Sequence, residues 1–324
     1  MFIKKILIRG FTLILCGIAA FCGFSQSPAV KSKPAQAKVP AQTFNTLLYE
    51  ISGKGLKKPS YLFGTMHILC EDDAVLSTNM KEIIKNVDKI YFELDMDNLQ
   101  EMLGAMKYLQ MNGGVKISDL LSAEEYSRLE AFMKKKVPIF PMSMINRYKP
   151  ILVSSLIGEQ VLDCEKKNGM EMVIMKEARS HEKEIKGLES AQFQAGLFDS
   201  IPYEKQAKEL MKYVDSMDHY VGATSEMVDV YKKQDLKRMD SLIRVSDPGM
   251  DEYMDLLLYG RNRRWVNFMP GFMAGQSILF AVGAGHLPGD QGVINLLRKN
   301  GYTVKPLKND MSVRPAGESI INNQ

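Results

Sequence analysis

Two four-residue motifs that end in histidine stand near opposite ends of the chain. They are Gly64-Thr65-Met66-His67 and Gly283-Ala284-Gly285-His286, and each directly follows an apolar, strand-like run. Glycine lets the backbone turn sharply after a strand and approach a ligand closely. Because ligands of open α/β sheets bind outside the carboxyl ends of the strands, the pattern predicts one site that contains both histidines.

Two carboxylates also follow short strand-like runs, namely Glu93 and Glu189. A carboxylate among apolar neighbours is costly to bury unless it is paired or bound to a metal ion. Two neutral imidazoles and a carboxylate suit a divalent metal ion. We therefore expect His67, Glu93 and His286 to bind a metal, and Glu93 or Glu189 to act as the catalytic base. The alternative is that both histidines are hydrogen-bonded core or turn residues and that Glu93 is exposed.

A cationic cluster precedes the second histidine motif. Arg261, Arg264 and Trp265 fall on one face of a predicted helix. A guanidinium there can hold a substrate carboxylate or an active-site acid, or stabilise an oxyanion, so Arg261 and Arg264 are candidate catalytic residues. The alternative is a solvated charged face with Trp265 in the core.

The elements that must position these residues follow from hydrophobic periodicity and turn signals. Strands are expected at both ends of the sequence, with a long, mainly helical insert between them. This pattern predicts an α/β (α+β) fold in which a mixed central β-sheet is flanked by helices. The expected strands are 45–51, 60–64, 89–94, 184–189, 277–283 and 302–307, and the expected helices include 79–87, 97–111, 150–164, 169–179, 202–244, 251–269 and 292–299.

The first residues have the pattern of a secretory signal: a basic start, an apolar stretch and small residues before a cleavage point. We expect a signal peptide at 1–25, a flexible linker at 26–42, a folded domain at 43–309 and a polar tail at 310–324. The protein would then be exported, periplasmic or extracellular, with no stable membrane span after signal cleavage. An uncleaved anchor, or lipidation at Cys16 or Cys22, is the alternative that keeps it attached to the envelope.

Charge and cysteine content bound the function further. Residues 1–25 contain three basic and no acidic residues, so their removal lowers the formal charge from +4 to +1. This balance does not predict a nucleic-acid partner, which requires a concentrated basic face.

Outside the signal, the chain retains Cys70 and Cys164. A disulfide between them and two free buried thiols are both compatible with the sequence.

The motifs together resemble the TraB/GumN family, which includes PrgY and is related to the Tiki proteases. The resemblance covers residues 45–308 and rests mainly on the two glycine–histidine motifs, with Phe92-Glu93-Leu94, Gly187-Leu188-Glu189 and the segment from Arg261 to Trp265 in support. It implies metal ligation by His67 and His286, with Glu93 as a ligand or general base. It also implies a fold shared with erythromycin-esterase and ChaN-like proteins.

The combined interpretation is an exported metal-dependent hydrolase, most simply a peptidase, that acts on a peptide or protein. The cofactor would be a divalent metal ion such as Mn, Co or Zn. The alternative is a non-catalytic envelope protein that binds haem, a metal or a peptide through the same residues. Histidines can ligate haem, and the ChaN-like relatives suggest it by analogy.

Overall fold

The computed structural model describes residues 44–245 and 251–312. The predicted signal peptide, the linker and most of the predicted tail lie outside the described residues, so these boundaries stay predictions. In the part that is described, no helix combines the length and the apolar character needed to cross a bilayer.

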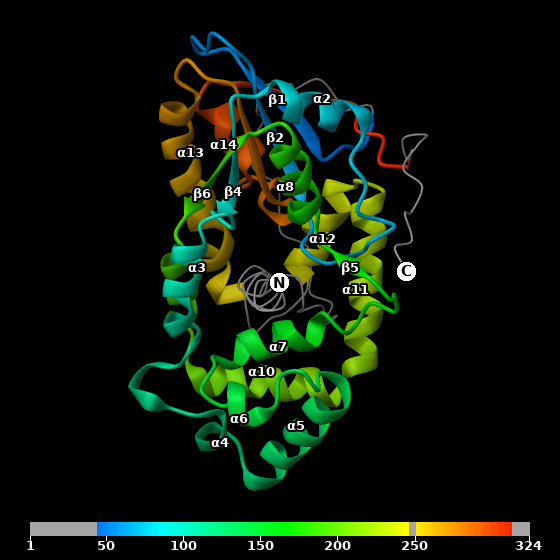
Figure 1. Cartoon of the computed structure of the whole chain (residues 1–324), viewed down its shortest axis with the longest axis vertical. Coiled ribbons are helices and arrows are strands. Elements are labelled where there is room, and N and C mark those ends of the chain that lie inside the picture. The colour runs from blue at the N-terminus through cyan, green and yellow to red at the C-terminus, as the bar shows by residue number, and fades with distance from the viewer. Residues whose placement is uncertain (1–43, 246–250, 313–324) are drawn as a thin grey trace, which may run out of the picture.

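A six-stranded mixed sheet forms the centre of the fold, in the order β6-β4-β7-β2-β1-β8 (Figure 1). The four strands β6, β4, β7 and β2 run parallel, whereas β1 pairs antiparallel with β2 and β8 pairs antiparallel with β1 at the edge of the sheet. The predicted mixed sheet is therefore confirmed. The strands are β1 (Leu48–Ser52), β2 (Ser60–Thr65), β4 (Lys89–Leu94), β6 (Glu184–Glu189), β7 (Ile278–Gly283) and β8 (Thr303–Pro306).

Helices cover both faces of the sheet, as the alternating side chains of β7 illustrate. Leu279 and Ala281 belong to the core that includes residues of α2 (Thr78–Asn86) and α8 (Met170–Ser180). Phe280 and Val282 point to the opposite core, which includes residues of α13 (Gly260–Met273) and α14 (Val293–Lys299). A strand buried on both faces has no polar side, which explains why residues 277–283 form a nearly continuous apolar run.

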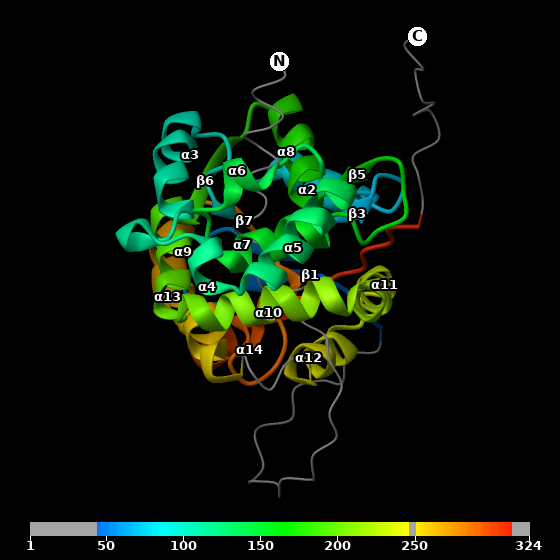
Figure 2. The ribbon, with the colours of Figure 1, turned by 90° about the horizontal axis from the view of Figure 1, so that it is seen from below.

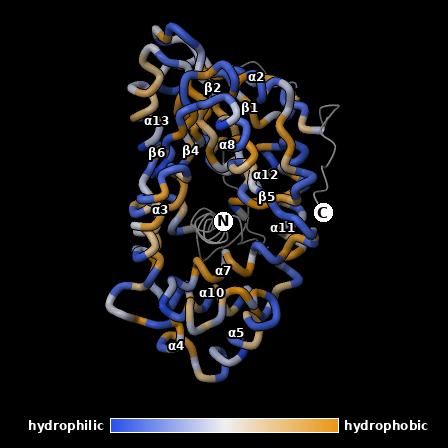
Figure 3. Tube along the Cα trace, viewed as in Figure 1, coloured by the Kyte–Doolittle hydropathy of each residue, from blue (hydrophilic) through white to orange (hydrophobic). Residues whose placement is uncertain are grey.

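The insert forms a helical region with a core of its own, at the end of the molecule away from the sheet in Figure 1 and in front of the sheet in Figure 2. Figure 3 shows α7 as largely hydrophobic, and its residues from Pro150 to Ile157 are all buried. The helices between the sheet strands are α3 (Leu99–Ala105), α4 (Ile117–Leu120), α5 (Ala123–Lys136), α6 (Met142–Ile145), α7 (Pro150–Gly158), α9 (Ala191–Leu197), α10 (Tyr203–Asp215), α11 (Met217–Lys232) and α12 (Leu236–Val245).

Several predicted helix boundaries are wrong. The helix expected at 150–164 ends at Gly158, and the helical periodicity at 202–244 is divided into the three helices α10, α11 and α12. The first break falls at Ser216, and the second follows Gln234, whose φ of 55° lies in the left-handed region. The side chain of Gln234 contacts Leu47 N and Asn309 O, so tertiary hydrogen bonds accompany this turn. Such contacts override local helical propensity.

A second, two-stranded sheet lies beside the first histidine motif and was not predicted. It pairs β3 (Leu69–Cys70) with β5 (Lys167–Asn168), and each strand is too short to show a periodicity. A disulfide joins Cys70 to Cys164 and holds their Cα atoms 5.9 Å apart. The segment after His67 is thereby attached to the segment that leads into α8.

Candidate active site

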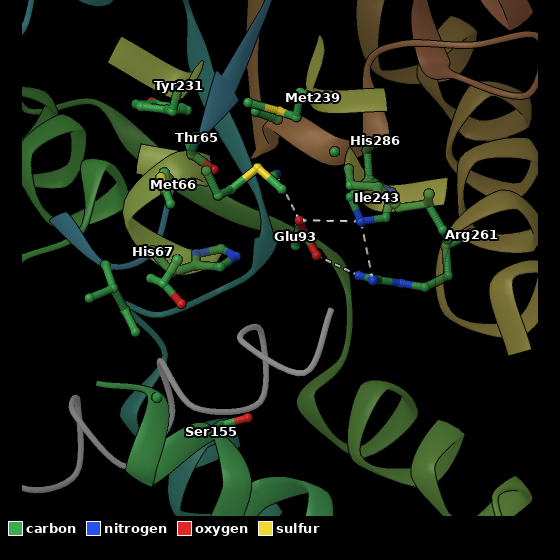
Figure 4. Close-up of a pocket in the computed structure, with 18 of the residues that line it drawn as sticks. Thr65, Met66, His67, Glu93, Ser155, Tyr231, Met239, Ile243, Arg261 and His286 are labelled. Carbon is green, nitrogen blue, oxygen red and sulfur yellow. Dashed lines mark hydrogen bonds and ion pairs between the residues drawn. The ribbon is translucent and has the colours of Figure 1, made fainter. Parts of the chain in front are cut away.

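The carboxyl ends of the four parallel strands bring the candidate residues to one edge of the sheet. Glu93 lies in β4, Glu189 ends β6, and His67 follows β2 by two residues. His286 lies in the short 3-10 helix η7 (Ala284–His286), directly after β7. Figure 4 shows Glu93 between His67 on one side and His286 with Arg261 on the other. The structure thus assembles residues from both ends of the chain.

Arg261 of α13 links the two carboxylates. Its Nη2 lies 2.5 Å from Glu93 Oε2 and 2.8 Å from Glu189 Oε2, and its Nε donates to Glu189 Oε2 at 3.0 Å. Gln194 of α9 donates to the same two oxygens, at 3.3 and 3.0 Å. Burial opposes ionisation of Glu93, but Arg261, the two histidines and the amide of Gly283 outweigh it and lower the pKa of Glu93 to about 2. Glu93 is therefore a carboxylate at neutral pH.

His286 is held in one tautomer by α13. Asn262 donates through Nδ2 to the main-chain oxygens of His286 and Gln291, so its Oδ1 accepts from His286 Nδ1 at 2.5 Å. Nε2 of His286 is left unprotonated, 3.7 Å from Glu93 Oε1 and 3.3 Å from Arg261 Nη1. Burial first, and then the charges of Arg261 and His67, lower the pKa of His286 to about 3 despite Glu93. A neutral imidazole whose Nε2 carries no proton can act as a metal ligand or as a base, and here this nitrogen accepts a hydrogen bond from Arg261.

His67 is oriented in a similar way by a different partner. Its Nδ1 lies 2.6 Å from Oε1 of Glu171, a buried residue in the first turn of α8. Met170 N donates to Met66 O at 3.0 Å, which fixes the start of α8 against the histidine motif. Burial lowers the pKa of His67, but Glu171 outweighs burial and leaves that pKa raised above its usual value. With Nδ1 engaged, Nε2 is the nitrogen that faces the site.

Gly283 lies in close contact with three of the candidate site residues. A Cβ atom at this position would lie 3.1 Å from Glu93 Oε1, 3.6 Å from His286 Cδ2 and 3.8 Å from His67 Nε2. The other motif glycines allow close packing: a Cβ on Gly64 would lie 3.0 Å from Ala284, and one on Gly285 would lie 2.9 Å from Ile243. The motif glycines therefore let the two histidine turns pack closely around the site.

The donor set fits a divalent metal ion in chemical type. Imidazoles whose second nitrogen contacts a carboxylate or an amide oxygen are the usual ligand arrangement in metal sites. The 3.7 Å between His286 Nε2 and Glu93 Oε1 compares with roughly 3.4 Å between two tetrahedral ligands that are each ~2.1 Å from zinc. Within the described ranges, however, no group of three His, Cys, Asp or Glu side chains has metal-binding geometry.

The buried charges of the site also favour a cation. With neutral histidines, the carboxylates of Glu93, Glu171 and Glu189 face one guanidinium, that of Arg261, and the set carries two excess negative charges. Among the described residues, Glu171 Oε2 and Glu189 Oε1 have no hydrogen-bond partner. Uncompensated buried charge is costly, and a divalent ion would neutralise the site.

Arg264 does not line the cavity beside Glu93 and His286, and its catalytic role stays a prediction without support from its position. Its guanidinium is exposed and lies over the rings of Phe193 and Phe268, 4.5 and 5.6 Å from their centroids. The buried stripe of α13 contains Arg261 and Asn262 and leaves Arg264 on the opposite side of the helix. Arg264 follows Arg261 by three residues, a spacing that can place two side chains on one face of a helix. The buried face of α13, however, lies on the side of Arg261 that is away from Arg264.

Sequence reasoning missed two residues that orient the histidines, Glu171 and Asn262. Glu171 follows Gly169, where a Cβ atom would lie 2.4 Å from His67 O, so the glycine before the helix was an available signal. Asn262 directly follows Arg261 within the segment that supports the family resemblance, and this position was a second signal; the structure shows Asn262 buried.

Residues 47–306 match the TraB/PrgY/gumN family, and the chain belongs to this family. Similar proteins include a Metalloprotease TIKI homolog of Amphimedon queenslandica, 24% identical over 82% of this chain and 62% of that protein. Human Metalloprotease TIKI1 is 20% identical over 92% of this chain and 68% of that protein. The chain thus spans about two thirds of the length of these relatives. No solved structure matches, so the likeness to ChaN-like proteins stays a prediction.

Proposed function

We propose that this protein is a metal-dependent hydrolase that cleaves peptide bonds. The observation that carries the proposal is the pair of histidines, of which His286 is buried and His67 is partly buried, each with its Nδ1 engaged by a fixed partner and its Nε2 turned toward Glu93 (Figure 4). The distant relatives named metalloproteases support the same reaction class. His67, Glu93 and His286 would hold the metal, with Mn, Co and Zn as suitable ions.

When bound, a divalent ion would lower the pKa of a coordinated water and polarise the scissile carbonyl. Glu189 keeps one oxygen, Oε1, without a hydrogen-bond partner among the described residues, so it can accept a proton if Glu93 serves as a ligand. Arg261 fixes both carboxylates and prevents either from swinging away. It also provides positive charge next to the site, where an oxyanion would develop.

We also propose that the protein is exported, after cleavage of residues 1–25. The disulfide between Cys70 and Cys164 supports this location, because such bonds persist in oxidising compartments and are rare in the cytosol. The folded domain at 43–309 would then follow the linker at 26–42. Mass spectrometry of the protein recovered from cell fractions would give the N-terminal residue and the location, and a cytosolic protein that begins at Met1 would contradict export.

Metal analysis of the purified protein tests the reaction class. We expect a bound divalent ion, metal-dependent cleavage of peptides, and loss of both in His67→Ala and His286→Ala. A protein with both histidines intact that binds no divalent ion rules out the proposal. An absorbance scan after incubation with haem tests the non-catalytic alternative, and a Soret band together with no peptide cleavage would favour it.

A further inference from the structure

A small cavity opens beside the proposed metal ligands, between the strand ends and the helical insert. Its volume is about 120 Å³, and Thr65, His67, Glu93 and His286 contribute to its wall (Figure 4). An engineered apolar cavity of roughly 150 Å³ binds benzene, so this one can hold a single medium-sized side chain. It is too small for a cofactor or a folded segment, which need roughly 300 Å³ or more.

The rest of the wall is mainly apolar. Apolar side chains come from the turn after β2, from α11 and α12, from the π-helix η6 (Asp255–Tyr259) and from η7, and they include Met66, Met227, Met239, Ile243, Leu258 and Ala284. Among the described residues that line the cavity, the only charged or titratable ones besides tyrosine are those of the proposed site itself. With a divalent ion bound, these charges are neutralised, so a charged side chain would enter this cavity without a charged partner among the described wall residues, at a high desolvation cost.

Tyr231 and Thr65 both line the cavity, but only the hydroxyl of Tyr231 has a hydrogen-bond partner among the described residues. Tyr231 donates its hydroxyl to Gly64 O at 3.0 Å and thus presents only its ring to the cavity. Thr65 is 2% exposed, and its Oγ1 has no hydrogen-bond partner among the described residues. A buried hydroxyl in a native protein normally has a partner, and a bound peptide main chain would supply one.

We propose that this cavity is a specificity pocket that receives an unbranched or γ-branched apolar side chain, of the size of methionine or leucine, from the residue next to the scissile bond. The inference rests on the proposed peptidase function. Full burial of such a side chain favours binding by about tenfold to a hundredfold over a polar one. Ile243 sets the depth of the pocket, because it packs against Gly285 of the second histidine motif.

Peptide sets that vary each position flanking the scissile bond test the preference with the full-length, metal-loaded protein. At one of the two positions we expect methionine, norleucine and leucine to exceed aspartate, lysine and glycine in kcat/KM by about tenfold or more. Ile243→Phe should fill the pocket and abolish this preference, whereas Ile243→Ala should extend it to phenylalanine. Ile139→Phe is the matched control, since Ile139 is 58% exposed and lies outside the cavity wall.

A binding measurement without metal separates this inference from the proposed function. N-acetyl-L-methioninamide should perturb NMR signals of the wild-type and Ile139→Phe proteins, and the neutral, polar N-acetyl-L-serinamide should not. Ile243→Phe should lose this response while its unfolding temperature stays within a few degrees of the wild type. If no peptide is cleaved, the peptidase proposal fails, but selective binding still supports the pocket. Equal cleavage of all residues, or an unchanged preference in Ile243→Phe, overturns the pocket.

Discussion

Glu171 Oε1 lies 2.6 Å from His67 Nδ1, so α8, which packs on one face of the sheet, orients the histidine of the first motif. The contact forms because Gly169 lets the backbone before α8 approach His67 O, where a side chain would collide. His286 has an amide rather than a carboxylate in the same place. The two histidines are thus fixed by partners of different charge, and the carboxylate makes His67 the more basic ligand.

Glu171→Gln should weaken metal binding about tenfold to a hundredfold while the protein still folds, because a neutral amide stabilises the imidazole less. The same change should lower the pKa of His67, which NMR titration of the metal-free protein would measure. Glu177→Gln is the matched control: Glu177 lies on the same helix and contacts His181, away from the site. Equal metal affinities in the two variants would contradict a positioning role.

His67→Ala and His286→Ala should each remove the bound metal and reduce peptide cleavage to background. His181→Ala serves as the control, since His181 pairs only with Glu177 among the contacts described for its ring. Elemental analysis of the three purified variants, together with their unfolding temperatures, gives the comparison. Metal retained by both site variants would place the ion elsewhere.

Gly283→Ala should abolish cleavage with little change in secondary structure. The added Cβ would lie 3.1 Å from Glu93 Oε1 and 3.8 Å from His67 Nε2, so it would displace a carboxylate that the site needs. Gly196→Ala is the control, because nothing lies within 4 Å of its Cβ position in α9, and it should stabilise the protein by up to ~1 kcal/mol. If Gly283→Ala cleaved peptides at the normal rate, the present position of the Glu93 carboxylate would not be required for cleavage.

Acid should destabilise the metal-free protein. The pKa of His286 is about 3 in the folded state, against about 6.5 in an unfolded chain, so only the unfolded state takes up this proton between those values. The free energy of unfolding should therefore fall as the pH drops from about 6.5 to 3. Glu93, with a folded pKa of about 2, adds to the loss below about pH 4.5.

His67 contributes in the opposite direction. Its raised pKa stabilises the folded state fully below about pH 6.5, and this contribution is lost as the pH rises through its folded value. Urea unfolding between pH 3 and pH 8, with EDTA present, measures the sum. His286→Gln should make the free energy of unfolding depend less on pH between pH 4 and pH 6. An unchanged dependence would show that His286 is already protonated in the folded protein in this range.

Loss of the disulfide should cost about 2–4 kcal/mol of stability, since the bond closes a long loop with a sequence separation of 94. The double variant Cys70→Ser, Cys164→Ser would be compared with the wild type in urea, with and without a reducing agent. Reduction should destabilise only the wild type. Weaker metal binding by the double variant is also expected, because Cys70 follows His67 closely on the segment that β5 holds.

The strands of the central sheet, the paired histidines, Glu93, Glu189 and Arg261 could all be located from the sequence because each follows or accompanies a strong apolar signal. Glu171 and Arg264 could not be placed correctly. The role of Glu171 depends on how α8 docks against the turn after β2, and the position of Arg264 depends on which stripe of α13 is buried. Docking and stripe orientation are set by tertiary packing, which a local pattern does not contain.

The central place of β7 has a consequence for how the molecule forms. β7 lies between β2 and β4, yet it is among the last strands to be synthesised. A chain that ends before residue 278 lacks the strand that joins β2 to β4, so His67 and Glu93 are not yet held together. Since domains fold as units once their sequence is complete, the site stays latent throughout synthesis and assembles only with the final segment.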